Sequence, residues 1–285
     1  MEQCKLEEFL RRKATGQLKI HAYQQRVSVA QQPAQLDSLA AEGAVRFGGV
    51  VQLAHAGSFA VLACDVSNKD QCSGDFTCSV SAVPRSGLCD PVARNTFTLA
   101  KYQPRRTELE QEPEHEDESV VHYGQKVMLL ANPKALEGTA LPPDASIMLY
   151  SRPVSTTQYA KLSRHQIVGL TSRTSYDAAW TVLTPDPAQR VISEGLPVLA
   201  GVPVLLQHCA TNQDLCLEGV TFRNDLGEEH EVSGHTAHSN SKRDVCVHAN
   251  AGKVRGQLEK MEQPANHWLF IGAFAHHDGE DEPQA

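Results

Sequence analysis

The segment that decides the fold is VRFGGVVQL at residues 45–53. Its apolar residues Val45, Phe47, Val51 and Leu53 occupy alternate positions, the period-two pattern of a half-buried β-strand. A glycine, Gly48, interrupts this alternation. The segment therefore predicts a strand that contains a glycine near its centre.

The same pattern returns twice further along the chain. Apolar residues alternate again around two later glycines: Val121, Tyr123, Val127 and Leu129 around Gly124, and Val198, Ala200, Val204 and Leu206 around Gly201. The three glycines are 76 and 77 residues apart. The agreement continues beyond them, since His55 and His208 lie at the same offset from the first and third glycine. This register indicates internal repeats.

Each repeat also closes on a short apolar strand with an aromatic residue, namely Phe97, Trp180 or Trp268. We place the repeats at about 44–105, 120–185 and 195–272. A unit with one apolar face cannot bury that face alone, so three copies are expected to close on one another and protect their sheet edges. This predicts an all-β, β-trefoil-like domain, and the motifs resemble those of MIR-type trefoils.

A short α-helix is expected before the repeats. Leu6, Phe9 and Leu10 have the i, i+3, i+4 spacing of one helical face, and Arg11 and Arg12 make the end of the helix basic. We predict that these five residues bind a partner, with packing on the chain's own domain as the alternative. The expected organisation is a helix and arm without clear periodicity at 1–43, the repeat domain at 44–272 and an acidic tail at 273–285.

Composition excludes several classes of partner. The 285 residues are 41% hydrophobic, enough for a substantial core, and carry a formal charge of -8 with a pI near 5.9. An acidic chain does not favour nucleic acid or an anionic membrane surface. No stretch reaches the length of a membrane span and the first ten residues lack an apolar signal core, so a cytosolic compartment is expected.

A reducing compartment keeps cysteines as thiols. The eight cysteines are residues 4, 64, 72, 78, 89, 209, 216 and 246. The spacing of Cys64, Cys72, Cys78 and Cys89 fits no common metal framework, so we interpret them as loop thiols.

Catalytic signatures are absent from the sequence, including the nucleophile elbow and the glycine-rich phosphate loops. His208 and Cys209 are adjacent, and neighbours on a strand point to opposite faces, so they are not expected to act as base and nucleophile. Trp180 and Trp268 could stack a sugar, but their equivalent repeat positions favour the core. We expect no catalytic residue and no cofactor.

A zinc site is conceivable near the end of the third repeat. Its candidate ligands are His235, His238, Cys246 and His248. Their spacing fits no zinc finger, and we favour the reading of surface polar residues.

Beyond single motifs, the order of several blocks resembles the cilia- and flagella-associated protein 161 family over most of residues 3–272. The blocks are Leu6 to Gly16 with Leu18, Arg94-Asn95-Thr96-Phe97, His122-Tyr123-Gly124-Gln125-Lys126-Val127-Met128-Leu129, Pro185-Asp186-Pro187 through Glu194-Gly195 to Pro197, His208-Cys209 with Thr211-Asn212, Glu231-Val232 with His235-Thr236, and Asn266-His267-Trp268.

The resemblance implies a non-enzymatic microtubule inner protein, bound to the luminal wall of axonemal doublet microtubules in cilia and flagella. Tubulin and neighbouring inner proteins would be its partners, and the A-tubule lumen its location. Family members carry more sequence before the first helix, so an anchoring segment is expected to be shorter or missing here. A MIR- or lectin-type trefoil that binds a sugar or other small ligand is the alternative, and a metal-dependent hydrolase is the weakest interpretation.

Overall fold

The structure, a computed structural model, describes residues 2–16, 18–69, 74–82, 89–103, 119–137, 141–142, 145–237 and 262–273. Within these residues the chain is mostly β. The helices are α1 (Glu2–Ala14), α2 (Lys19–Ala30) and α3 (Arg190–Ser193). The strands are β1 (Val50–His55), β2 (Val61–Lys69), β3 (Phe76–Ser81), β4 (Phe97–Lys101), β5 (Lys126–Ala131), β6 (Met148–Arg152), β7 (Gln166–Thr171), β8 (Trp180–Leu183), β9 (Leu205–His208), β10 (Leu215–Asn224), β11 (Gly227–Gly234) and β12 (Trp268–Ile271).

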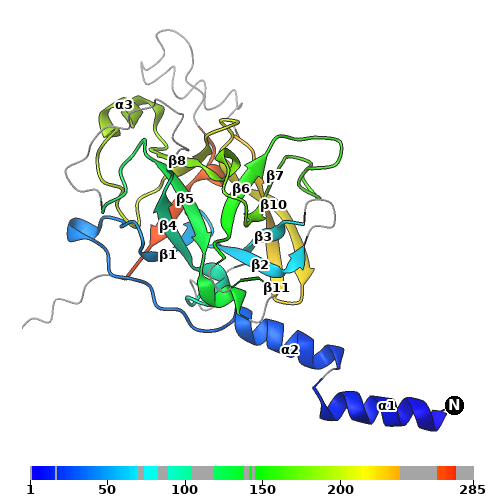
Figure 1. Cartoon of the computed structure of the whole chain (residues 1–285). Helices are drawn as coiled ribbons and strands as arrows, with labels where there is room; N and C mark the ends of the chain where they lie inside the picture. Colours follow the sequence, from blue (N-terminus) through cyan, green and yellow to red (C-terminus); the bar gives the residue numbers. More distant parts are fainter. Residues whose placement is uncertain are drawn as a thin grey trace, which may run out of the picture.

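Half of the strands close into a barrel (Figure 1). β1 pairs with β4, β4 with β5, β5 with β8 and β8 with β9, always antiparallel. β12 pairs with β1, and Val204, just before β9, forms a bridge with Trp268 of β12. The ring therefore returns to its starting strand and leaves no open edge.

The other strands form the hairpins β2–β3, β6–β7 and β10–β11. One strand of each hairpin meets the other two, because β3 pairs with β7, β7 with β11 and β11 with β3. The hairpins thus cover one end of the barrel together.

The segments that begin the three predicted repeats are joined to one another by a cycle of backbone hydrogen bonds. Val45 N–H donates to Val198 O at 2.8 Å, Val198 N–H to Val121 O at 2.8 Å, and Val121 N–H to Val45 O at 2.9 Å. The three valines are fully buried. Each valine lies three residues before Gly48, Gly124 or Gly201, so the cycle joins the same position of the three segments.

The glycines explain why each predicted strand is divided in two. Gly48, Gly124 and Gly201 have φ values of 77°, 86° and 74°, in the left-handed region that favours glycine. Each glycine N–H donates to a backbone carbonyl of the last strand of the same predicted repeat. The acceptors are Leu99 on β4 for Gly48, Val182 on β8 for Gly124 and Phe270 on β12 for Gly201. The chain therefore turns at the glycine, and the regular strand begins only afterwards.

The core lies inside the barrel and beneath the hairpins. Phe97, Trp180 and Trp268 are the first residues of β4, β8 and β12, and all three are fully buried. Each tryptophan also places its indole N–H on a backbone carbonyl, Trp180 on Leu149 at 3.0 Å and Trp268 on Leu215 at 2.9 Å. The prediction that both tryptophans belong to the core is confirmed, and neither is available as a platform for a sugar.

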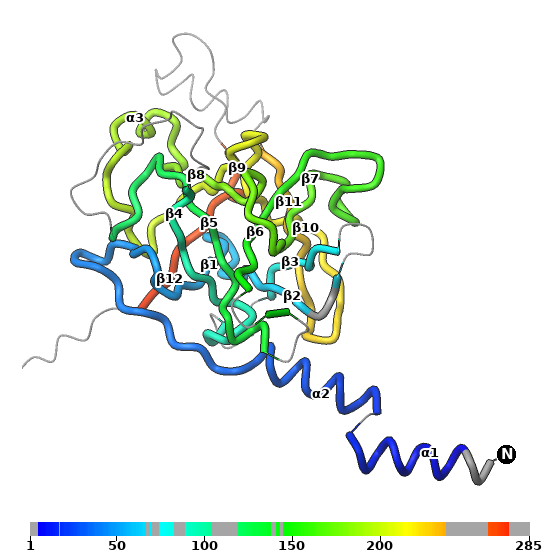
Figure 2. The backbone as a smooth tube through the Cα atoms, in the orientation of Figure 1, coloured from blue at the N-terminus to red at the C-terminus, as the bar shows by residue number. Residues whose placement is uncertain are grey.

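The N-terminal region departs from the prediction. The short helix predicted from Leu6, Phe9 and Leu10 is present as α1, but the following stretch, predicted as an arm without periodicity, contains the second helix α2. Figure 2 shows both helices extending from the body of the molecule. Among the described helices, none has the length and apolar character that crossing a membrane requires.

Candidate partner-binding surface

α1 carries the predicted partner-binding residues on an open surface. The side chains of Leu6, Phe9 and Leu10 are 58%, 48% and 52% exposed, and Arg11 and Arg12 are exposed beside them. The apolar residues share one face because residues three and four apart are neighbours on a helix. The alternative, in which this stripe packs on the chain's own domain, is not observed in the described structure.

α2 connects α1 to the barrel. Tyr23, Val27 and Ala30 follow the i, i+4, i+7 spacing and are half-buried, while the rest of the helix is largely exposed. This stripe is hard to recognise from the sequence, because the other apolar residues of the helix include Ala22 and Val29, which lie on other faces. After α2, Ala34 N–H donates to Pro91 O and Ala93 N–H to Gln32 O, which fixes the chain against the body.

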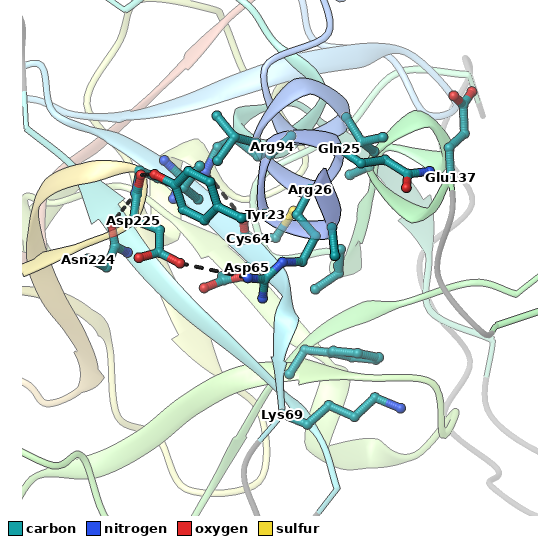
Figure 3. Close-up of a pocket in the computed structure, with 18 of the residues that line it drawn as sticks. Tyr23, Gln25, Arg26, Cys64, Asp65, Lys69, Arg94, Glu137, Asn224 and Asp225 are labelled. Carbon is teal, nitrogen blue, oxygen red and sulfur yellow. Dashed lines mark hydrogen bonds and ion pairs between the residues drawn. The ribbon is translucent and has the colours of Figure 1, made fainter. Parts of the chain in front are cut away.

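A cavity of about 680 Å³ lies between α2 and the body. Figure 3 shows Tyr23 and Arg26 of α2 reaching towards Asp225, in the turn between β10 and β11. The Tyr23 hydroxyl donates to the Asp225 carbonyl at 3.3 Å, and the Arg26 guanidinium lies 4.0 Å from the Asp225 carboxylate. At the other end Gln32 donates to Glu137 at 3.1 Å. These contacts are exposed and few, so α2 is held more weakly than the strands.

Arg94 lines this cavity from the body side, but its guanidinium already binds other side chains of the body. It lies 2.6 Å from the Glu229 carboxylate and donates to the Ser81 hydroxyl at 3.0 Å. Ser79 also donates its hydroxyl to Glu229. The remaining charged lining residues have both signs: Arg26, Lys69, Asp65, Glu137 and Asp225. A mixed lining suits a polar protein segment more than a phosphate group.

A second cavity, of about 380 Å³, lies where the hairpins meet. Tyr150, Tyr159 and Phe222 line it together with the carboxylate of Glu231. That carboxylate accepts N–H groups from Leu162 at 2.8 Å and Ser163 at 2.6 Å. Glu231 therefore holds a loop in place.

His208 and Cys209 do not form a catalytic pair. His208 is fully buried, and its Nδ1 lies 2.8 Å from the Thr211 hydroxyl while its Nε2 lies 2.9 Å from the Asp177 carbonyl. Burial lowers the pKa of His208 and raises the pKa of the Cys209 thiol, whose sulfur lies 3.2 Å from the Thr181 hydroxyl. Both shifts disfavour a thiolate–imidazolium pair.

Only one of the four candidate zinc ligands lies within the described residues. His235 stacks on His165, with ring centroids 3.8 Å apart, and His165 in turn lies 2.6 Å from the Glu218 carboxylate. His238, Cys246 and His248 lie outside the described residues. Across the described ranges, no group of three or more His, Cys, Asp or Glu side chains is arranged to hold a metal.

The cysteines of the first segment differ from the prediction. The sequence predicts Cys64 and Cys78 as loop thiols, but they lie opposite each other on β2 and β3. Both are free thiols, and burial raises the pKa of Cys64 to about 12. Cys89 is free and lies outside the regular strands, whereas Cys72 is outside the described residues. Cys64 and Cys78 belong to the packed interior and are poor nucleophiles.

Solved structures give a likeness of fold. The SDF2-like protein from Arabidopsis thaliana has a TM-score of 0.50 and 15% sequence identity, and the match covers 81% of this chain and 97% of that protein. At this identity the similarity concerns the fold alone.

Sequence comparison with curated proteins is more specific. Cilia- and flagella-associated protein 161 of Danio rerio is 31% identical over 185 residues, which cover 65% of this chain and 50% of the relative. The protein of the same name from Bos taurus is 29% identical over 182 residues, covering 64% of this chain and 46% of the relative. The chain thus spans about half the length of these curated relatives.

The domain family described as Cilia- and flagella-associated protein 161-like domain matches residues 59–247. This match covers more than half of the chain, and it agrees with the resemblance carried by the sequence motifs. The chain belongs to the cilia- and flagella-associated protein 161 family.

Proposed function

We propose that this chain is a non-enzymatic structural protein of the axoneme, a microtubule inner protein bound to the luminal wall of doublet microtubules. In this role it stabilises the doublet for ciliary and flagellar movement, with tubulin and neighbouring inner proteins as its partners and the A-tubule lumen as its location. The observation that carries the proposal is α1, an amphipathic helix with a basic last turn that leaves its apolar face uncovered, on a chain of a cilia- and flagella-associated family.

The body acts in this proposal as a rigid β-trefoil of three repeats. The barrel ring, the hairpins that pair with one another and the cycle of hydrogen bonds between Val45, Val121 and Val198 support threefold closure. The proposed repeats are about 44–105, 120–185 and 195–272, within a domain at 44–272 that follows the N-terminal helices and arm and precedes an acidic tail at 273–285.

Partner binding is assigned to Leu6, Phe9, Leu10, Arg11 and Arg12 of α1. An amphipathic helix binds by laying its apolar face in a groove, and basic side chains beside that face steer it to an acidic surface. The acidic balance of the whole chain suits a luminal site, which lies away from the acidic tubulin tails on the outside. Many weak contacts along a repeating lattice together give durable attachment.

Stepwise extraction of cilia tests the proposal. The tagged chain is expressed in ciliated cells, and isolated cilia are treated first with detergent and then with high salt. Retention in the salt-washed doublets is the expected result. Release of the unmodified chain by detergent would contradict the structural role.

Variants of α1 then test the assigned residues. Replacement of Leu6, Phe9 and Leu10 by Ala removes the apolar stripe and preserves helix propensity. We expect this variant to move into the salt-soluble fraction. The matched control replaces Val154 and Val220, exposed aliphatic residues outside the N-terminal helices, by Ala. Equal retention of both variants would show that α1 does not attach the protein.

A further inference from the structure

The connection between β8 and β9 carries an apolar knob, which we define as Val191, Ile192 and Leu196. Their side chains are 83%, 78% and 53% exposed, and the first two are the most exposed large apolar side chains in the described parts of the chain. Such side chains, gathered within six residues, differ from the single exposed apolar residues found on most protein surfaces. Figure 1 shows α3, which carries Val191 and Ile192, at the opposite end of the molecule from α1.

The end of the knob at α3 is held to the body by an ion pair and side-chain hydrogen bonds. The Arg190 guanidinium lies 2.6 Å from the carboxylate of Glu262, near the start of the last described segment, and donates to the Thr184 carbonyl at 3.0 Å. The hydroxyls of Thr184 and Ser193 lie 2.6 Å apart. These contacts fix α3 at its first and last residues, so its two exposed aliphatic side chains project from a fixed backbone.

The other end is fixed by backbone hydrogen bonds. Gly195 N–H donates to the Tyr123 carbonyl at 3.0 Å, and Tyr123 N–H donates to the Leu196 carbonyl at 2.9 Å. Asp186 caps the preceding turn by accepting the Ala188 N–H at 3.0 Å. A surface ordered in this way loses little conformational entropy on binding, which is a property of good binding anchors.

The charges beside the knob indicate the chemistry of its partner. Within the connection from Thr184 to Pro197 the acidic residues are Asp186 and Glu194, and the single basic residue, Arg190, is neutralised by Glu262. The Glu194 side chain is exposed and directly follows α3. A complementary surface would therefore offer an apolar pocket with Lys or Arg at its edge.

We infer that Val191, Ile192 and Leu196 form a second docking point, which inserts into an apolar pocket with a basic edge on a protein partner. The inference rests on the proposed function in one respect, that the partner is part of the doublet microtubule. Two anchors at opposite ends of the molecule, α1 and the knob, would bridge two sites of a lattice and raise attachment through effective concentration.

The test uses the full chain and short, open-ended fragments of salt-washed doublets from cilia that lack the protein, so that purified protein added back can reach the luminal wall. The variant Val191→Asp with Ile192→Asp places charge in the proposed contact. The matched control, Val154→Asp with Val220→Asp, adds the same charge at other exposed aliphatic positions. We expect the knob variant to bind the doublets at least about tenfold more weakly, with the control unchanged.

Two further results complete the test. Glu194→Lys should weaken binding more than Glu194→Gln. Stronger binding of the Lys variant would contradict the proposal that the partner's pocket has a basic edge. Equal binding of the knob variant and the control, with the unmodified chain retained, would overturn the inference and leave the proposed function intact. If the unmodified chain does not bind, the proposed function itself is contradicted.

Self-association of the chain is the remaining outcome. If the chain associates with itself as its concentration rises and the knob variant does not, the knob binds a second copy of the chain. That result would overturn the assignment of the partner to the doublet.

Discussion

The Arg94 guanidinium and the Glu229 carboxylate form an ion pair 2.6 Å long, with side chains only 7% and 1% exposed. Arg94 lies in the short 3-10 turn Ala93–Asn95 before β4, and Glu229 lies on β11. The pair therefore joins the first segment of the barrel to the last hairpin. A buried charge that loses its partner is costly, so this contact ties the two regions together.

Replacing Arg94 alone should destabilise the fold strongly. Arg94→Met leaves Glu229 as an uncompensated buried charge, and we expect the free energy of unfolding to fall by about 3–5 kcal/mol. Urea denaturation followed by circular dichroism measures the change.

The control removes both charges. Arg94→Met combined with Glu229→Leu leaves no unpaired charge, so we expect this double variant to be more stable than Arg94→Met. A double variant that is no more stable than Arg94→Met would contradict the assigned role of the pair.

Removing the charge of Asp214 should have the opposite effect on stability, because this carboxylate lacks a strong partner. Its Oδ1 accepts a hydrogen bond from Gln207 at 3.3 Å, and its buried Oδ2 has no hydrogen-bond partner among the described residues. Burial, assisted by the nearby Glu262, raises the pKa of Asp214 from 3.8 to about 6. The folded state therefore binds this proton more tightly than the unfolded state, and stability is lost as the pH rises from 3.8 through about 6.

Asp214→Asn should consequently stabilise the protein at neutral pH. The shift corresponds to a penalty of about 3 kcal/mol for the ionised group, and Asn keeps an acceptor for Gln207. We expect the free energy of unfolding at pH 7.5 to rise by about 1–3 kcal/mol in urea titrations. At pH 3.5 the gain should disappear. An equal gain at both values would mean that ionisation is not its source.

His55 and His208 share one neutral tautomer, and their burial opposes protonation. Each Nε2 lies 2.9 Å from a carbonyl oxygen, of Pro264 and Asp177 respectively, so each Nε2 must carry the hydrogen. The Nδ1 of His55 then accepts the Ser58 N–H at 3.2 Å. Burial is the first cause that lowers the pKa of both histidines below 6.5.

Stability should therefore decrease as the pH falls through 6.5. Below this value the unfolded state binds protons that the folded histidines resist, and the decrease is complete once the folded groups also protonate. Asp214 acts in the opposite direction, so the decrease is expected to be steeper in the Asp214→Asn variant. Ring ¹⁵N chemical shifts should report neutral Nε2–H tautomers at pH 7, and Nδ1–H tautomers would contradict the assignment.

The parts of the fold that the sequence predicted depend on local patterns. Gly48 and the alternating residues around it predict a strand interrupted at a glycine without knowledge of the neighbouring chain, because side-chain period and positive φ are properties of a short segment. The equivalence of His55 and His208 followed from the same register. Contacts between distant segments could not be predicted in this way, and the pair of Arg94 and Glu229, 135 residues apart, is an example.

The two proposed docking surfaces differ in the same respect. The apolar stripe of Leu6, Phe9 and Leu10 was found because a helical face is a periodic signal. The exposure of Val191 and Ile192 could not be found, because aliphatic residues in a sequence are by default expected in the core. Only the arrangement of the surrounding chain leaves these two side chains in solvent.

Gly169 gives a final prediction about the site where the hairpins meet. It lies on β7 opposite Thr77 of β3 and Tyr150 of β6. A Cβ at this position would lie 2.9 Å from the Phe76 carbonyl oxygen, where something must move, and 3.0 Å from the Tyr150 ring, which would have to shift by a few tenths of an ångström. The first neighbour is backbone within a sheet, and the second is a buried ring, so neither can move without disturbing the junction.

Gly169→Ala should therefore destabilise the protein by about 1–3 kcal/mol through overpacking, measured by urea denaturation. Gly219→Ala is the matched control, since Gly219 also lies on a strand, has no positive φ and would place its Cβ in open space. That variant should be neutral or slightly stabilising, because alanine restricts the unfolded chain more than glycine does. Similar losses in both variants would contradict overpacking at Gly169, whereas a loss confined to Gly169→Ala would assign it to the close approach of β7 to Phe76 of β3 and Tyr150 of β6.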